Sequence, residues 1–545
     1  MRDGFRQSIA WLHTWSGLLV CWVLLLIFMA GTSSYYRDEI TFWMKPELHA
    51  SAAAPAPGVA AASHAVRILQ ERAPGATRWI IDLPDGRSPI LNLNWTMPPV
   101  KGQTPAERRA AFRRQSIALD PATGAEIQRP RETRGGEFLY RLHFDLYYMP
   151  AIWGRWIVGF CAMFMLVAII SGVITHKRIF KDFFTFRPRK GQRSWLDAHN
   201  ATAVLALPFH LMITYTGLVT LMFMYMPLPG KLLYNGDDKA LLAEVFPNNE
   251  RGKPARVAAP MADIAPMVEQ AVRKWSVDPA RIFINHPGDA NATVHFIRPS
   301  GTQLSNTEPS MVFNAATGAL ISADEEVSRA SAARRGFYGL HLAHFADPLL
   351  RALFFLCGLA GCAMVATGAL LWAVKERQKS AKAVANGGRP GFGVRLVDSL
   401  NIGAIAGLPI ALGAYFWGNR LLPLTLEART DAEASCFFAA WGISALLAQV
   451  SPTRRMWQIQ LAAGGLLLGG IPLINALTTD FHLGVTLFGA PGLRPVAAFD
   501  LVAMGLGLML AYAARVVGQK KNMLSTKRRA PAPRDAETRA AELSA

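Results

Sequence analysis

The sequence predicts a multi-pass membrane protein with an all-α core of about eight membrane-spanning helices and two small α+β modules outside the bilayer. Apolar residues make up 51% of the 545-residue chain and gather in several long runs. Each such run reaches the roughly 18 residues that a membrane helix needs. Two long polar regions interrupt the runs, and the segments around them recur in the same order. These observations exclude a soluble globular protein.

Hydropathy places the eight spans at residues 12–34, 152–175, 199–225, 349–373, 398–418, 434–451, 457–477 and 494–516. The first run lies close to the N-terminus but lacks an A-x-A cleavage site and resembles an interior run, so we expect it to be retained as a span.

The positive charge indicates which loops face the cytoplasm. The formal net charge is +19, and Lys and Arg concentrate in the short connections 177–193 and 375–395 and after Arg515. Short loops rich in Lys and Arg stay in the cytoplasm. We therefore expect a multi-pass membrane protein with both termini in the cytoplasm and both modules on the outer side. This charge pattern does not require a nucleic-acid partner.

The two polar regions have the same predicted order of elements. In each, an amphipathic helix (HAVRILQERA or MVEQAVRKW) precedes short alternating strands. A turn follows in the same place, DPATG in the first region and NAATG in the second. The recurrence predicts a duplicated module.

The spans around the modules also repeat. His13 precedes Gly31 by the same number of residues as His199 precedes Gly217, and the segments RLHFDLYYMP and GLHLAHFADP lead from the modules back into the membrane. The repeat predicts that the first four spans form a bundle with a pseudo-two-fold axis along the membrane normal.

The predicted organisation has eight parts. They are the first span (1–36), the first module (37–145), spans two and three with their basic loop (146–225), the second module (226–340), the fourth span (341–375), a cytoplasmic linker (376–396), spans five to eight (397–517) and a disordered basic tail (518–545).

Several cofactor motifs are absent. The chain has no C-x-x-C-H for covalent haem attachment, no C-x-x-C pair for zinc or an iron–sulfur cluster, and no G-x-G-x-x-G that opens a helix after a strand. A haem would therefore be bound without a covalent link. A flavin or nicotinamide domain is not predicted, so a cytoplasmic donor or membrane quinol would supply any electrons.

The LHTWSGL start of span one, the LH segments followed by Pro150 and Pro348, and the modules that close in DPATG and NAATG resemble the PepSY-associated transmembrane family. The resemblance covers roughly residues 5–380, so spans five to eight lie outside it. It implies PepSY-like modules and a bundle that binds haem b through histidines. It also implies that members pass electrons outward to ferric chelates such as siderophores.

Four histidines are the main candidate haem ligands. His13 and His199 follow the nearest cytoplasmic arginines, Arg6 and Arg193, at the same depth, about 9–10 Å along the helix. Two imidazoles at one depth suit a bis-histidine haem, and His143 and His341 form a second symmetric pair. The alternative is that these histidines hydrogen-bond headgroups or cap interfacial helices. We expect two haems.

Three more histidines are candidates for the same cofactors. His344 follows His341 on nearly the same helix face, where it could replace the ligand or hydrogen-bond a propionate. His210 lies on the face of His199 at mid-membrane depth, as a ligand or a buried relay. His176 is a ligand or an interfacial anchor. The remaining histidines in the modules, His49, His64, His286 and His295, are predicted at the surface.

The outer mouth of the bundle is predicted to be rich in aromatic and basic residues. A ferric chelate would suit such a surface, with Arg141, Tyr147, Arg335 and Tyr338 as candidate contacts. The alternative is an ordinary aromatic belt at the membrane interface.

The sequence thus favours an oxidoreductase, a ferric-siderophore reductase that releases Fe(II). Two rival classes stay open. One is a non-enzymatic protein whose modules bind or signal, and the other is a transporter of iron chelates.

Overall fold

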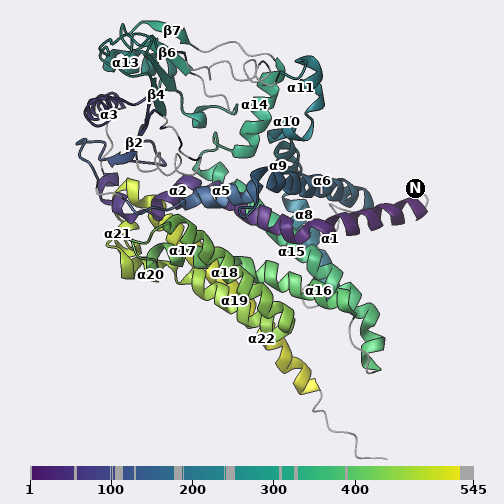
Figure 1. Ribbon diagram of the computed structural model, residues 1–545. Helices are drawn as coiled ribbons and strands as arrows, with labels where there is room; N and C mark the ends of the chain where they lie inside the picture. Colours follow the sequence, from purple (N-terminus) through teal and green to yellow (C-terminus); the bar gives the residue numbers. More distant parts are fainter. Residues whose placement is uncertain are drawn as a thin grey trace, which may run out of the picture.

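The computed structural model describes residues 3–53, 58–98, 115–127, 130–176, 190–237, 252–305, 310–323, 329–386 and 391–527, with the single residues 100, 102, 104, 187 and 240. Most of the predicted basic loop 177–193 and the tail after residue 527 lie outside the described residues. Long helices form one part of the molecule, and a sheet with its own helices forms the other (Figure 1).

Within the described residues, seven helical stretches are long and apolar enough to cross a membrane, and one bent helix pair brings the number of spans to as many as eight. The prediction of a multi-pass membrane core is therefore confirmed. The spans consist of α1 (Asp3–Ser34), α6 (Ala151–Thr175), α8 (Gln192–Leu205) with α9 (Leu207–Thr220), α15 (Pro348–Ala385), α16 (Phe392–Asn401) with α17 (Gly407–Leu421), α18 (Arg429–Val450), α19 (Arg454–Gly469) with α20 (Ile471–Thr478), and α22 (Arg494–Lys527). A π-helical turn, η5 (Ile402–Ala406), joins α16 to α17.

The third span is broken rather than continuous as predicted. Helices α8 and α9 meet at an angle of 68° at Ala206. Pro208 lies in the first turn of α9, where it has no N–H to donate to a carbonyl one turn earlier. The corresponding helix of the first half, α1, runs unbroken from Asp3 to Ser34.

Shorter helices connect the spans to the sheet. They are α2 (Arg37–Trp43), η1 (Pro46–Leu48), η2 (Ala50–Ala53), α5 (Gly135–Asp145), α10 (Met222–Tyr225), α11 (Leu228–Leu233), α14 (Arg329–Leu342), α21 (Leu483–Thr486) and η6 (Pro491–Leu493). Helix α5 contacts α1, and α14 contacts α9. The predicted cytoplasmic linker is shorter than expected because α15 continues to Ala385. The predicted C-terminal tail is also shorter, because α22 continues to Lys527.

The strands of both predicted modules form one seven-stranded antiparallel sheet in the order β3-β2-β1-β4-β5-β6-β7. The strands are β1 (Arg78–Asp82), β2 (Leu91–Thr96), β3 (Ser116–Leu119), β4 (Arg281–Asn285), β5 (Thr293–Ile297), β6 (Ser310–Asn314) and β7 (Leu320–Ala323). The modules join where β1 pairs with β4, from Arg78 opposite Asn285 to Asp82 opposite Arg281. Two separate modules were expected, but their edge strands hydrogen-bond to each other. Four-residue β3 and β7 thus become the ends of the sheet.

The helices α3 (Gly58–Arg72) and α13 (Ala265–Trp275) contact each other and share a core with the sheet. The two predicted turns have the same geometry. Asp120 Oδ1 accepts the backbone N–H groups of Ala122 and Thr123, and Asn314 Oδ1 accepts the corresponding pair in the second turn. The glycine of each turn has a positive φ, 69° at Gly124 and 73° at Gly318, which glycine adopts at little cost.

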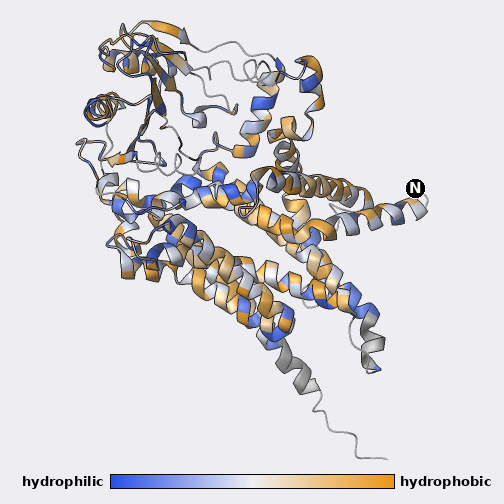
Figure 2. Cartoon of the chain, in the orientation of Figure 1, coloured by the Kyte–Doolittle hydropathy of each residue, from blue (hydrophilic) through white to orange (hydrophobic). Residues whose placement is uncertain are grey.

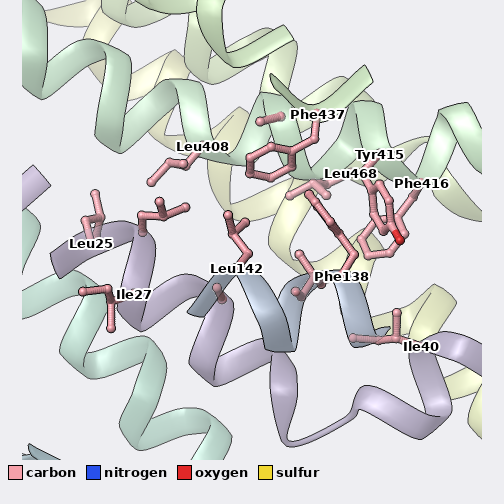
Figure 3. Packing of buried hydrophobic residues seen from close by; sticks show 14 of the residues in the cluster. Leu25, Ile27, Ile40, Phe138, Leu142, Leu408, Tyr415, Phe416, Phe437 and Leu468 are labelled. Atoms are coloured by element: carbon pink, nitrogen blue, oxygen red, sulfur yellow. The ribbon is translucent and has the colours of Figure 1, made fainter. Parts of the chain in front are cut away.

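Hydrophobic residues predominate along the long helices, whereas the sheet part mixes hydrophobic and hydrophilic residues (Figure 2). The largest core cluster joins the first four spans to the last four. Phe138 and Leu142 of α5 point toward Tyr415 and Phe437 of the C-terminal helices (Figure 3). The ring centres of Phe138 and Tyr415 are 4.6 Å apart. Spans five to eight therefore pack on the core that carries the histidines.

Candidate cofactor site between two histidine pairs

The first pair consists of His13 on α1 and His199 on α8, whose ring centres are 6.2 Å apart. Each ring is held by a carbonyl of a neighbouring helix. His13 Nδ1 lies 2.8 Å from the carbonyl oxygen of Ala168, and His199 Nδ1 lies 2.9 Å from that of Met364. Because a carbonyl only accepts, Nδ1 is the protonated nitrogen in both rings and Nε2 keeps its lone pair.

The second pair consists of His143 on α5 and His341 on α14, whose stacked rings are 6.1 Å apart. His143 Nδ1 donates to the carbonyl oxygen of Ile27 at 2.8 Å. His341 Nδ1 lies 3.1 Å from Thr216 Oγ1, whose own proton is donated to a backbone carbonyl. Burial lowers the pKa of His341 to about 3, so the ring is neutral at pH 7. This pair therefore also leaves Nε2 unprotonated.

A glycine of a neighbouring helix lies against each of the four rings. A methyl group on Gly31 would come within 2.7 Å of the ring of His143. At the other three positions it would come within 3.1 Å: Gly172 against His13, Gly368 against His199 and Gly217 against His341. The bare helix surface lets each ring approach the neighbouring backbone closely, and an alanine would fill that space.

From the sequence, Gly31 and Gly217 were used only to recognise the repeat, and none of the four glycines was given a role at the histidines. The signal that could have identified them was the constant spacing from His13 to Gly31 and from His199 to Gly217. That spacing places a ligand at one end of a helix and a glycine for the other pair at its opposite end.

Each pair lies in a cavity. The first cavity, of about 780 Å³, extends from Arg6 and Lys375 past His13 and His199 to His210. The second cavity has a smaller volume, about 180 Å³, and is lined by His143 and His341. Leu24 and Met165 line both cavities, which are therefore adjacent along α1 and α6.

His210 is fully buried at the inner end of the first cavity, close to the break between α8 and α9. Its ring meets Phe28 edge-on at 6.1 Å, and Phe28 lines the second cavity. Neither ring nitrogen has a hydrogen bond of normal geometry within the described part of the chain, although the carbonyls of Ala203 and Cys357 lie nearby. His210 thus lies between the two pairs.

The other two candidate histidines line the cavity openings. His176 Nε2 accepts a hydrogen bond from the amide of Asn200 at 3.0 Å, and both residues line the first cavity. His344 lines the second cavity. Neither ring forms a pair with another histidine like those of the first and second pairs in the described structure.

One prediction about the remaining histidines is wrong. His49 was expected at the surface but is fully buried. Its ring packs between Phe42 at 4.7 Å and Phe481 at 5.4 Å, and its Nε2 is 2.9 Å from the carbonyl oxygen of Phe42. Phe481 belongs to the last loop of the chain, and no local pattern places it beside residue 49.

The predicted substrate contacts are not brought together. Tyr338 lines the second cavity, as does Tyr140 at the corresponding position of α5. Arg141 instead pairs with Glu137 at 3.0 Å on the same helix. Tyr147 packs on Phe438 of the C-terminal bundle, and Arg335 lies on α14 outside the residues that line the cavity.

Among the described residues, no group of three or more His, Cys, Asp or Glu side chains could hold a metal ion. The two histidine pairs can therefore offer two imidazole ligands each, and a metal bound there needs its remaining ligands from another molecule.

The family model for the PepSY-associated TM region matches residues 10–375. The chain is also 26% identical over 392 residues to the uncharacterized protein PA4219 of Pseudomonas aeruginosa. That match covers 69% of this chain and 93% of the relative. Both histidine pairs and all four glycines lie within the residues that the family model matches.

Proposed function

This chain belongs to the PepSY-associated TM region family, and we propose that it is a haem b protein of the bacterial inner membrane that passes electrons to a periplasmic ferric chelate. It would act as an oxidoreductase of the ferric-siderophore reductase type and release Fe(II). His13 and His199 would hold one haem, and His143 and His341 a second.

The separation of the paired rings carries the proposal. A bond from a metal to an imidazole nitrogen is about 2.0–2.1 Å long. Two imidazoles on opposite sides of one iron therefore place their nitrogens about 4 Å apart, with the ring centres about 6 Å apart. The observed separations are 6.2 Å and 6.1 Å.

The hydrogen bonds at Nδ1 also support ligation. A histidine that donates from one ring nitrogen presents the other as a ligand in a fixed orientation and with raised basicity. The carbonyls of Ala168, Met364 and Ile27 and the hydroxyl of Thr216 accept in this way. The donor set therefore fits an iron whose four remaining ligands come from a flat macrocycle.

Haem b bound between the two rings of a pair would supply a carrier of single electrons. The chain's own residues would orient the imidazoles and exclude water, and the apolar spans would insulate the path between the pairs. His210 and Phe28 would bridge the two cavities, with His210 as a relay or an additional ligand. Reduction would free the iron because hard oxygen ligands hold Fe(II) less tightly than Fe(III).

The first cavity, with its larger volume, supports haem binding more directly than the smaller second cavity. Haem content per protein therefore separates one bound haem from two. The electron donor would be a cytoplasmic protein or membrane quinol that reaches the end of the first cavity near Arg6 and Lys375.

A transporter of iron chelates is the second candidate, and the broken third span favours it. Interrupted helices in the middle of a membrane often line substrate paths in transporters. The colour of the purified protein distinguishes a haem-containing reductase from a transporter or a binding protein. A reducible haem spectrum in the purified protein supports the reductase, whereas colourless protein supports a transporter or a non-enzymatic binding or signalling protein.

The decisive test is reoxidation under anaerobic conditions. We expect dithionite-reduced protein to be reoxidised rapidly by a ferric hydroxamate, with Fe(II) trapped by a ferrous-specific dye. His341→Ala should slow this step more than Arg141→Gln, because it removes a ligand rather than a surface charge. Reduced protein that persists for minutes with several ferric chelates but is oxidised promptly by quinone would contradict the chelate-reductase proposal.

A further inference from the structure

The mouth of the second cavity is built by two parts of the chain. Arg37 on α2, Tyr140 on α5 and His344 after α14 belong to the bundle. Arg87 also lines this cavity, although it belongs to the loop between β1 and β2 of the sheet. The sheet therefore contributes a side chain to the cavity that holds the second histidine pair.

Arg87 is fixed in this position from both sides. Asp85 accepts the backbone N–H groups of Arg87 at 2.8 Å and Ser88 at 2.7 Å, which orders the loop. The guanidinium group reaches Glu39 through Nε at 2.9 Å and through a terminal nitrogen at 2.7 Å. It also pairs with Asp38 at 3.0 Å. Only 23% of the side chain is exposed, so these contacts are largely shielded from water.

Among the charged residues that line the cavity, the two guanidinium groups of Arg37 and Arg87 outnumber the single carboxylate of Asp38. Arg351 also pairs with Glu39, at 3.0 Å, and Arg37 contacts Asp38 at 3.3 Å. Three guanidinium groups, those of Arg37, Arg87 and Arg351, thus share the carboxylates of Asp38 and Glu39. Glu137 lies 3.6 Å from Arg37 but also pairs with Arg141, at 3.0 Å. An arriving anion would balance this excess.

His344 lacks the partner that a buried imidazole needs. Its Nδ1 is buried and has no hydrogen bond among the described residues. Burial and the nearby charges of Arg37 and Arg87 lower the pKa of His344 to about 4, so the ring is neutral at pH 7. The sheet part approaches this residue closely, because a methyl group on Gly301 would lie 3.2 Å from the carbonyl oxygen of His344. A buried polar group left without a partner is costly, and a bound acceptor would remove that cost.

We propose that this mouth, formed by Arg37, Arg87 and His344, is a carboxylate-binding site that links the sheet to the second cavity. A guanidinium group carries five N–H donors and can bind an additional acceptor besides its ion-pair partners, and a neutral imidazole N–H can donate to a carboxylate. Two sources share this chemistry: the propionates of a haem in the second cavity and the carboxylates of an incoming ferric chelate. The inference rests on the proposed haem-binding function.

The test compares four variants of the full-length, haem-loaded protein. Arg87→Gln and His344→Gln remove one partner each. Arg87→Lys keeps the positive charge but removes the guanidinium group. Arg67→Gln is the control, because this exposed arginine pairs with Glu71 on α3 and does not line the cavity. His344→Gln leaves the contacts of Arg87 with Asp38, Glu39 and the carbonyl of Tyr35 intact, and so tests the site without loosening the sheet.

If propionates occupy the site, transfer of the second haem to apomyoglobin should be about tenfold faster or more in Arg87→Gln and His344→Gln. It should be unchanged in Arg67→Gln and intermediate in Arg87→Lys. Reconstitution with haem dimethyl ester should abolish the difference between wild type and variants.

If a chelate's carboxylates occupy the site, haem transfer should be unchanged. Reoxidation by ferric citrate should then slow about tenfold in the same variants, while reoxidation by a neutral ferric hydroxamate should not. Coloured protein in which neither haem transfer nor citrate oxidation differs from wild type would overturn the carboxylate site alone. Colourless wild-type protein would instead overturn the proposed function.

Discussion

The histidine bundle, α1 to α15, and the C-terminal bundle, α16 to α22, both bury polar side chains but use them differently. In the histidine bundle, four imidazoles face one another across cavities, and a glycine lies behind each ring. In the C-terminal bundle, buried Arg, Asn, Glu and Asp side chains bond to one another and to α2. Among the described residues, the first arrangement leaves the Nε2 atoms of the imidazoles free, whereas the second pairs most of its polar atoms with one another.

Hydrogen bonds link the buried polar side chains of the C-terminal bundle to one another and to α2. Arg420 donates to the carbonyl oxygen of Trp43 at 2.7 Å and to Asn475 Oδ1 at 3.0 Å. Asn475 donates in turn to Asp500 at 3.0 Å, and Asp500 accepts Trp43 Nε1 at 2.9 Å. Arg429 forms an ion pair with Glu433 in which both side chains are almost completely buried.

This difference distinguishes a binding site from a polar interface that only holds two helix bundles together. Polar groups that satisfy one another hold two bundles together and need no ligand. Imidazoles that are oriented at Nδ1 and free at Nε2 gain a partner only when something binds between them. The three predictions below test that separation, in descending order of their effect on haem content.

The largest effect is expected from the histidines themselves. His13→Ala and His199→Ala should each remove the same haem, and His143→Ala and His341→Ala should each remove the other, because one imidazole cannot hold the iron in a six-coordinate site. Haem content per protein and redox titration of each variant measure this. His482→Ala in the C-terminal bundle is the control and should lose no haem. Additive losses from His13→Ala and His199→Ala would show that these residues serve different irons.

A smaller effect is expected from Gly31→Ala. The added methyl group would lie 2.7 Å from His143, so the ring would shift away from the carbonyl that orients it. We expect roughly tenfold weaker binding of the second haem. Gly17→Ala on the same helix is the matched control, because a methyl group there meets no atom within 4 Å. Equal haem affinity in the two variants would argue that the glycine does not shape the site.

The smallest effect on haem content is expected from Glu433→Ala, which should mainly reduce stability. The change leaves the buried guanidinium of Arg429 without its carboxylate, and breaking a buried pair in this way costs about 3–5 kcal/mol. Thermal unfolding of the detergent-solubilised protein measures the loss. The fraction that stays folded should keep its full haem content. Haem loss from folded Glu433→Ala protein would mean that the C-terminal bundle takes part in the site.

Local patterns in the sequence determined the spans, the strand and turn order of the modules, and the two histidine pairs. A membrane helix needs a long apolar run, a half-buried strand needs alternation, and a repeat places equivalent side chains at equal depth, so each feature is encoded by residues close together in the chain. The ring centres lie 6.2 Å apart in the His13–His199 pair and 6.1 Å apart in the His143–His341 pair, and the role of these rings as ligands stays a prediction.

Tertiary structure decided what depends on residues far apart in the chain. The pairing of β1 with β4 merged the expected modules into one sheet, and Phe481 covered His49. The placement of Arg87 beside Glu39 connected the sheet to the second cavity. Each of these contacts joins segments separated by many residues. Local propensity is the same whether or not such segments meet, so only packing of the whole chain selects them.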